Sequence, residues 1–140
     1  MPTGPDNVVL NKAATIERAL RRVRQEYAFN PALDNCTHID AMILNIERAC
    51  QAAIDLAQHL VAEHHLGAPQ SSAELFILLK KANRLSEEAT RAMIAMTGFR
   101  NVAIHEYQEL DMAILRAIAE KEYQSLITFC REAGVEIRVD

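Results

Sequence analysis

The stretch THIDAMILNIERACQAAIDLAQHLVAEHH, residues 37–65, carries the longest helical pattern of the chain. Its apolar residues recur about every 3.5 positions, the spacing of helices that pack nearly parallel to one another. Residues 37–40 resemble a capping box, with Asp in place of the usual Glu, and are expected to open the helix. The predicted stripe consists of Ile39, Ile43, Ile46, Cys50, Ala53, Ala57, Leu60 and His64, broadened by Met42, Ala49, Ile54, Leu56 and Val61.

Four further helices are predicted around this one, because apolar residues recur at spacings of three and four between caps and breakers. Short polar side chains cap helix starts, whereas glycine and proline end helices. The first helix starts at Asp6 or Asn7 and ends near Phe29, before Asn30-Pro31; Gly67 and Pro69 end the long helix; residues 71–74 (SSAE) open a short third helix; Ser86 caps the fourth; Asp111 caps the fifth and Gly134 ends it.

These features predict an all-α fold, an antiparallel bundle of four main helices plus one short helix, in a single domain over residues 1–140 with residues 1–6 frayed. Although half the residues are apolar, no apolar run is long enough to cross a membrane. The N-terminus shows no basic segment followed by an apolar one, so no signal peptide is expected. We therefore expect a cytoplasmic protein with no membrane partner.

The cysteines and histidines do not form a recognisable metal motif. Three cysteines are an odd number without metal-type spacing, and we expect all of them to be reduced and structural. His59, His64 and His65 lie near one helix end, with no Cys or paired acids beside them in sequence. They are therefore interpreted as cations that offset the helix dipole. The prediction is a protein without a metal site or a cofactor.

Charge is distributed unevenly in the chain. The formal net charge of −4 argues against a large electrostatic surface for nucleic acid. Arg18, Arg21 and Arg22 are nevertheless neighbours on the first helix, at spacings of three and four. They are either an ordinary solvated face or a shelf that contacts a polyanion such as RNA.

Residues 98–107, GFRNVAIHEY, gather the groups with the most chemistry. The apolar seam expected to face the core is Met96, Phe99 and Ala103. On a regular helix Asn101 and His105 share a face roughly opposite this core seam, so a second copy of the chain is expected to cover it. Arg100 presents a planar fork suited to phosphate, and His105 can take and give a proton near neutral pH. With the 2′-hydroxyl of RNA as nucleophile, these two residues would suffice for cleavage without a metal. The alternative is that they are surface polar residues at a helix end.

The chain resembles the HepT-like branch of the HEPN domains. Residues 100–107 match the R-x4-6-H-x-Y signature of that branch, and residues 67–71 (GAPQS) match its G-x-P-x-S linker. Residues 45–48 and 54–57 are similar to the family's long second helix. The resemblance covers most of the chain.

The resemblance implies a homodimer with the motif residues in a cleft at the dimer interface. It implies a toxin of a type II toxin–antitoxin pair that acts as a metal-independent endoribonuclease on RNA. Arg100 and His105 would be catalytic, with Asn101 supporting them. The implied partner is an MntA-like minimal nucleotidyltransferase antitoxin, which neutralises the toxin by binding it, by transferring AMP to Tyr107, or both. An AMP there would fill and repel the phosphate site.

Two other functions stay open from the sequence. HEPN-type domains also occur as non-catalytic subunits that present substrate or nucleotide to a nucleotidyltransferase, in which case Arg100 and His105 bind without cleaving. A structural dimer with an inactive site is the third possibility. Glu106 would either pair with Arg100 or raise the pKa of His105, and the sequence does not choose between these roles.

Overall fold

The computed structural model describes residues 6–105 and 111–140, with side chains described for 6–101 and 111–140. Every regular element in this part of the chain is helical, which confirms the all-α class. No helix within it is long and apolar enough to cross a membrane. The elements are α1 (Asn7–Phe29), α2 (Cys36–Glu63), α3 (Ser72–Lys81), α4 (Glu87–His105), α5 (Met112–Ala117), the π-helical turn η2 (Ile118–Glu122) and α6 (Gln124–Glu132).

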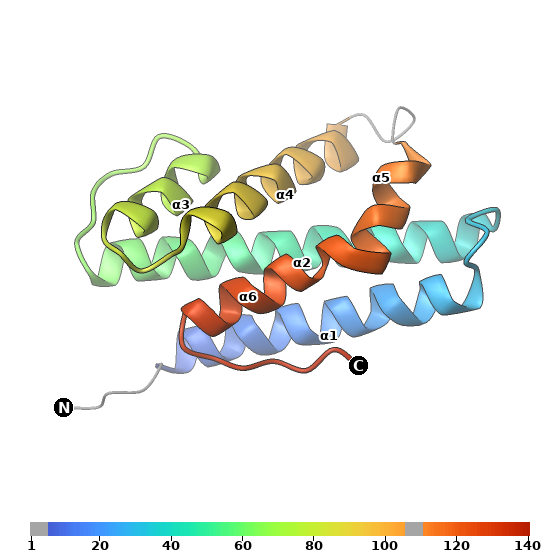
Figure 1. The fold of residues 1–140 in the computed structure, drawn as a ribbon, viewed down its shortest axis with the longest axis horizontal. Coiled ribbons are helices and arrows are strands. Elements are labelled where there is room, and N and C mark those ends of the chain that lie inside the picture. Colours follow the sequence, from blue (N-terminus) through green and yellow to red (C-terminus); the bar gives the residue numbers. More distant parts are fainter. Residues whose placement is uncertain (1–5, 106–110) are drawn as a thin grey trace.

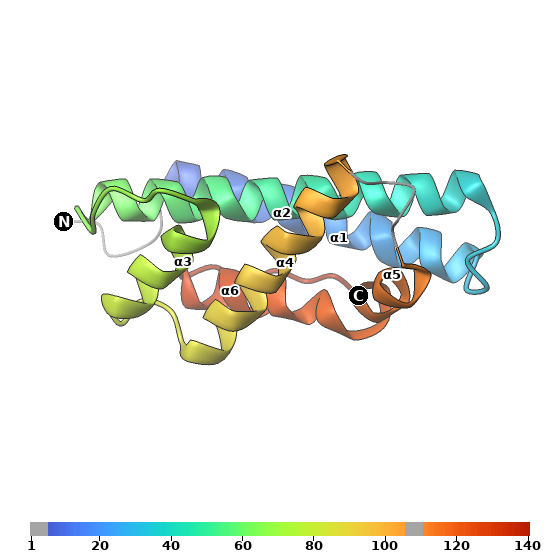
Figure 2. The same cartoon turned by 90° about the horizontal axis from the view of Figure 1, so that it is seen from above.

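The two longest helices, α1 and α2, form an antiparallel pair along the whole length of the molecule (Figure 1). Seen from above, α3, α4 and α6 lie on one side of this pair (Figure 2). The C-terminal end of α4 rises to the level of α2 and ends beside it (Figures 1 and 2). The described helices enclose one apolar core. Helix α4, which carries the start of the predicted motif at residues 100–107, packs against α2 in this core.

The apolar stripes predicted from the sequence form that core. Ile16, Leu20 and Val23 of α1 have no measurable exposure, and neither has Ile46 of α2. Burial of each such side chain contributes about 1.5–3 kcal/mol relative to exposure. Cys50 and Cys130 are buried free thiols, as expected of small apolar residues, whereas Cys36 is exposed and does not have the structural role predicted for it.

Four of the predicted helix caps are confirmed by their hydrogen bonds. Asp6 accepts from the amide of Val9, Ser71 from Glu74, Ser86 from Ala89, and Asp111 from Ala113. Each bond satisfies an amide that has no partner within its own helix. The local sequence therefore defines where α1, α3, α4 and α5 begin.

The limits of α2 differ from the prediction. The cap is Asn35, whose side chain accepts from the amides of Thr37 and His38, so the variant capping box at 37–40 is wrong. At the other end His65, with φ of 54°, occupies the left-handed position predicted for Gly67. The amide of Leu66 bonds back to the carbonyl of Val61, closing the helix two residues earlier than a glycine stop requires.

The predicted fifth helix is divided rather than continuous. Between α5 and α6 the π-turn η2 lets the amide of Tyr123 bond to the carbonyl of Ile118, five residues back. The turn accommodates one extra residue and changes the direction of the chain, as Figure 1 shows. Leu115, Leu126 and Phe129 are all fully buried across the break. The apolar stripe was thus predicted correctly, but not the change of helix type.

The last six residues return along α1 as an extended strap, residues 135–140 (Figure 1). Ile137 and Val139 of the strap are buried. The side chain of Arg21 donates to the carbonyl of Arg138 at 2.8 Å, and the carboxylate of Glu17 accepts from the amide of Arg138 at 2.7 Å. The strap therefore fixes the outer side of α1, a feature that the sequence did not predict.

Candidate functional site

Arg100 lies in the last part of α4, beside α2. Its Nε atom is buried and has no hydrogen-bond partner among the described residues. A buried donor without a partner costs about 1–3 kcal/mol, so such groups are rare and mark places where a ligand is bound or strain is stored. Arg100 as a whole residue is only partly buried, so part of it is accessible from outside the core.

Cys50 of α2 is a buried neighbour of the positively charged Arg100. Burial raises the pKa of the Cys50 thiol to about 12, against a lowering effect of the nearby Arg100 cation. At neutral pH the thiol is therefore uncharged and offers Arg100 no counter-charge. Cys50 therefore does not neutralise the positive charge of Arg100.

The structure describes only part of the predicted motif. Asn101 is exposed, which agrees with a position on the side of α4 opposite the core seam. His105 is the last residue of α4, so it continues the same helix as Arg100. The side chain of His105 and the whole of Glu106 and Tyr107 lie outside the described residues.

Helix geometry relates Arg100 to His105 along this element. Five residues correspond to a rise of about 7.5 Å and a rotation of about 140° around the axis. Positions 101 and 105, four residues apart, fall on one face of a regular helix. Positions 100 and 105 thus belong to one helix but to different sides of it.

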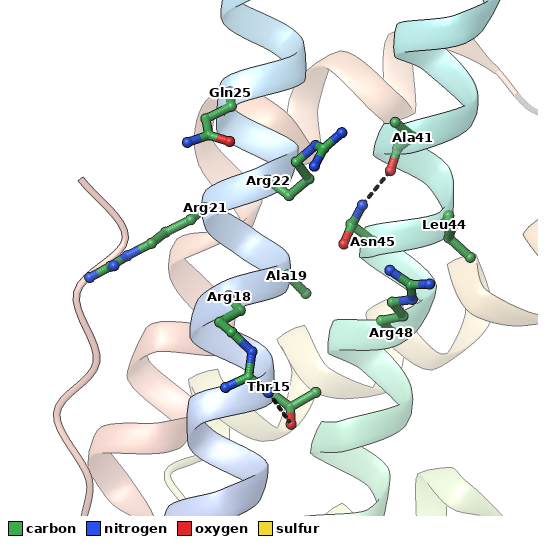
Figure 3. Close-up of a pocket in the computed structure, with 10 residues that line it drawn as sticks. All are labelled: Thr15, Arg18, Ala19, Arg21, Arg22, Gln25, Ala41, Leu44, Asn45 and Arg48. Carbon is green, nitrogen blue, oxygen red and sulfur yellow. Dashed lines mark hydrogen bonds between the residues drawn. The ribbon is translucent and has the colours of Figure 1, made fainter.

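The arginine shelf predicted on α1 is one wall of a groove between α1 and α2 (Figure 3). The cavity measures about 600 Å³, and α2 contributes the opposite wall. No carboxylate is among the side chains that line it. The lining residues are Thr15, Arg18, Ala19, Arg21, Arg22, Gln25, Ala41, Leu44, Asn45 and Arg48.

The four arginines of this groove differ in orientation. Arg22 and Arg48 extend toward the gap between the helices, and Arg18 lies lower along α1 (Figure 3). Arg21 points the other way, toward the C-terminal strap, where its Nε donates to Arg138. The sequence prediction therefore grouped Arg21 with a surface that it only borders, and it missed Arg48, which comes from the neighbouring helix.

The partners of these arginines leave most of their donors free. Arg22 uses its Nε to bond Glu26 at 2.7 Å, while Arg18 has only a long bond to the hydroxyl of Thr15. Arg48 has no hydrogen bond or ion pair with any described residue. Arg22 is thus neutralised by Glu26, whereas Arg18 and Arg48 have no carboxylate partner among the described residues and present guanidinium groups whose charge is not neutralised locally.

His59 has acidic neighbours, contrary to the prediction. Its Nε2 lies 2.7 Å from a carboxylate oxygen of Asp6 and 3.0 Å from one of Glu63. The hydrogen bond from the Val9 amide, followed by that from His59, lowers the pKa of Asp6 to about 2. The nitrogen of His59 and the carboxylate oxygens of Asp6 and Glu63 lie within 4.8 Å of one another. The sequence predicted Asp6 only as a helix cap, because its contact with His59 of α2 depends on how the helices pack.

Comparison with known proteins identifies the family. The family model described as ribonuclease HepT-like matches residues 14–133. The chain belongs to the HepT-like ribonuclease family. The HepT-like chain is 34% identical over 125 residues to the mRNA nuclease HepT of Shewanella oneidensis, covering 89% of this chain and 94% of the relative. It is also 34% identical over 61 residues to the tRNA nuclease HepT of Aphanizomenon flos-aquae, covering 44% and 42% of the two chains.

Solved structures of HepT-like relatives share the whole fold. The tri-AMPylated HEPN toxin of Shewanella oneidensis, in complex with the MNT antitoxin, matches with a TM-score of 0.87 and 33% identity, over 92% of this chain and 98% of that one. A toxin–antitoxin structure with AMP-PNP matches with a TM-score of 0.87 and 32% identity, over 91% and 98%. The family resemblance inferred from residues 100–107 is therefore confirmed.

Proposed function

We propose that this HepT-like chain is the toxin of a type II toxin–antitoxin pair and an endoribonuclease that requires no metal ion. The observation that carries the proposal is the guanidinium of Arg100, which has a buried donor without a partner on the helix that ends at His105. Its relatives are named as mRNA and tRNA nucleases, which supports RNA as the substrate. Asn101, on the same face of α4 as His105, supports the site.

The reaction uses a nucleophile that RNA itself provides. His105 takes the proton of a 2′-hydroxyl as the oxygen attacks the adjacent phosphorus, and the bond from phosphorus to the 5′-oxygen breaks. An imidazolium protonates that leaving oxygen, giving a 2′,3′-cyclic phosphate and a 5′-hydroxyl. Arg100 holds the charge that develops on the phosphorane oxygens. Protons and bonds balance without any further reactant.

Two copies of the chain are proposed to form the complete site. On a regular helix, positions 100 and 105 are about 140° apart around the axis, so we do not expect one α4 helix to direct both side chains toward the same phosphate. A two-fold axis beside the exposed face that carries Asn101 would bring the motifs of both copies into one cleft. One histidine then acts as base and the other as acid.

RNA cleavage in the presence of EDTA tests the chemistry. We expect His105→Ala to lower the cleavage rate by about 10²–10⁴-fold, the usual contribution of a general base. Arg100→Ala is expected to cost about 10²–10³-fold. Arg91→Ala is the matched control, because Arg91 is also on α4 but is exposed and, among the described residues, pairs only with Glu87. Wild-type activity in His105→Ala would refute the assignment, and nucleotide binding without any cleavage would favour a non-catalytic partner subunit.

The partner is proposed to be an MntA-like nucleotidyltransferase antitoxin that inactivates the toxin by binding it, by modifying Tyr107, or both. The phenolic oxygen of Tyr107 would attack the α-phosphate of ATP and release pyrophosphate. The added phosphate, two residues from His105, would occupy the anion site and repel RNA. The support is the tri-AMPylated state of the relative in complex with its antitoxin.

Mass spectrometry after co-expression with such an antitoxin tests this step. We expect the peptide that contains Tyr107 to gain whole AMP units, and Tyr107→Phe to gain none. Loss of cleavage without any AMP on the wild-type peptide would instead assign neutralisation to binding alone.

A further inference from the structure

The groove between α1 and α2 is distinct from the Arg100 site, and its lining is unusual for this chain. The whole sequence carries a net charge of −4, yet four arginines and no carboxylate line this one cavity. Three of them, Arg18, Arg22 and Arg48, surround the gap, and all three are exposed. Like charges gathered in one groove repel one another, so the arrangement favours an anionic occupant.

The shape of the groove indicates a chain of anions rather than a single ion. Arg18 and Arg22 are one turn apart, separated by about 6 Å along α1, and Arg48 faces them from α2. A cavity of about 600 Å³ is far larger than one phosphate requires. The lining also includes the apolar side chains of Ala19, Ala41 and Leu44, which could contact sugars or bases between the phosphates. Guanidinium groups bind phosphate through two parallel hydrogen bonds, and free forks of this kind are present here.

The groove also lies at the level of the catalytic motif. Its α2 wall spans residues 41–48, and Cys50, which is near Arg100, follows directly on the same helix. On a helical projection, Cys50 lies about 160° from Arg48, so the Cys50 side of α2 faces away from the groove. The groove and Arg100 are therefore on different sides of α2, about one helix diameter apart, roughly 10 Å. An RNA strand bound in the groove would have to pass around α2 to reach Arg100.

We propose that the α1–α2 groove is a second RNA site, which binds the phosphate backbone of single-stranded RNA outside the cleavage centre. Arg18, Arg22 and Arg48 are positioning residues in this site and take no part in bond breaking. The inference rests on the proposed ribonuclease function for the identity of the polyanion. An acidic protein surface is the competing occupant, but a groove of about 600 Å³ with a single exposed large apolar residue, Leu44, is a poor match for the broad contact area of a protein interface.

Binding is best measured with RNA that cannot be cleaved. A fluorescein-labelled single-stranded RNA with 2′-O-methyl groups lacks the nucleophile, so anisotropy reports affinity alone. We expect the double variant Arg18→Gln/Arg48→Gln to weaken binding by about tenfold or more, and to reduce the slope of log K against log salt by about 1.4. Arg48→Lys, which keeps the charge but loses the fork, is expected to lie between the wild type and the double variant.

The matched control is Arg91→Gln/Arg131→Gln. It removes the same charge from exposed arginines of α4 and α6 that are paired with Glu87 and Glu136. We expect its affinity and salt slope to stay within about twofold of the wild type. Equal losses in the control and the groove variant would show that net charge alone governs binding, and the groove proposal would be wrong. Efficient displacement of the RNA by polyglutamate at equal charge would assign the groove to an acidic protein instead.

Cleavage kinetics separate this proposal from the catalytic one. With cleavable RNA, we expect the groove variant to raise KM and to leave kcat unchanged, because the groove contributes equally to substrate and transition-state binding. A fall in kcat at saturating RNA would contradict a positioning role. If the wild type binds RNA through the groove but cuts none, the ribonuclease proposal fails and the groove stands. If the wild type cuts RNA and the groove variant binds it normally, the groove proposal fails and the ribonuclease proposal stands.

Discussion

Glu26 joins the two long helices at the end where the chain turns from one to the other. Its side chain is almost fully buried, accepts from Arg22 at 2.7 Å and bonds the ring of His38 on α2. The hydrogen bond with His38, followed by that with Arg22, lowers the pKa of the Glu26 carboxyl from its ordinary value of 4.5. The ionised form is therefore the one that the fold stabilises.

We predict that Glu26→Gln lowers the free energy of unfolding by about 1–3 kcal/mol at pH 7, because a buried carboxylate and its charged partners lose their bonds. The folded pKa is lowered, so this stability is present above the unfolded value of 4.5 and is lost as pH falls through the folded value. Urea unfolding of both proteins should thus give a difference that is constant at neutral pH and shrinks in acid. Glu88→Gln, an exposed change on α4, should have no effect at either pH.

Single residues also show where sequence reasoning stopped. The spacing of Arg18 and Arg22 on one helix was visible directly, because neighbours on a helix follow from sequence separation alone. The sequence could not show that Arg48 lies beside them, because its place in the groove depends on which side of α2 packs against α1. Arg21 was misplaced because the strap that attracts it had no recognisable pattern. Local geometry was predictable here, and contacts between distant segments were not.

At the level of elements, α4 is fixed at its start by a contact to α6. The hydroxyl of Ser86 accepts from the amide of Ala89, which caps α4. The same hydroxyl donates to Glu132, and the amide of Ser86 bonds the other oxygen of that carboxylate at 2.7 Å. Ser86 therefore links the helix that carries the motif to the last helix of the chain.

We predict that Ser86→Ala destabilises the protein by about 1–2 kcal/mol, the usual cost of a lost helix cap. Ser125→Ala on α6 is the control, because the described residues form no hydrogen bond with its hydroxyl. Urea unfolding measures both. A cost below about 0.5 kcal/mol for Ser86→Ala would show that Glu132 alone holds the start of α4.

Helix starts were predicted more reliably than helix ends and breaks. Asp6, Ser71, Ser86 and Asp111 cap through bonds to residues two or three positions away, so their signal is local. The π-turn η2 has no comparable signal. Its sequence, IAEKE, is ordinary for an α-helix, and the extra residue is accommodated where the chain passes from α5 to α6. Tertiary packing, rather than local preference, determined that break.

At the level of the whole molecule, the strap over residues 135–140 completes the core. Ile137 is 6% exposed, and Val139 is 8% exposed. We predict that Ile137→Ala lowers the free energy of unfolding by about 2 kcal/mol, near the lower end for a buried isoleucine because the strap lies at the edge of the core. Arg138→Ala should be nearly neutral, since Arg138 holds α1 through its main chain. Thermal unfolding measures both variants. Equal losses of stability would show that the buried side chain of Ile137 is not the source of the stability that the strap contributes.

The all-α class and the family were accessible from the sequence, because heptad-like stripes and the motif at 100–107 are local patterns. The position of the motif beside Cys50 and the groove at the same level of α2 were not, since both need the packing of α1 and α4 on α2. The strap escaped prediction because six residues without helical periodicity look like any tail.

The same strap bears on the synthesis of the protein. The bonds from Arg138 to Glu17 and Arg21 span 121 and 117 positions. At about 5–20 residues per second, a ribosome delivers α1 roughly ten seconds before the segment that clasps it. During that interval the outer side of the first helix has no cover from its own chain. The first helix is thus covered by its own chain only after Arg138 has been synthesised.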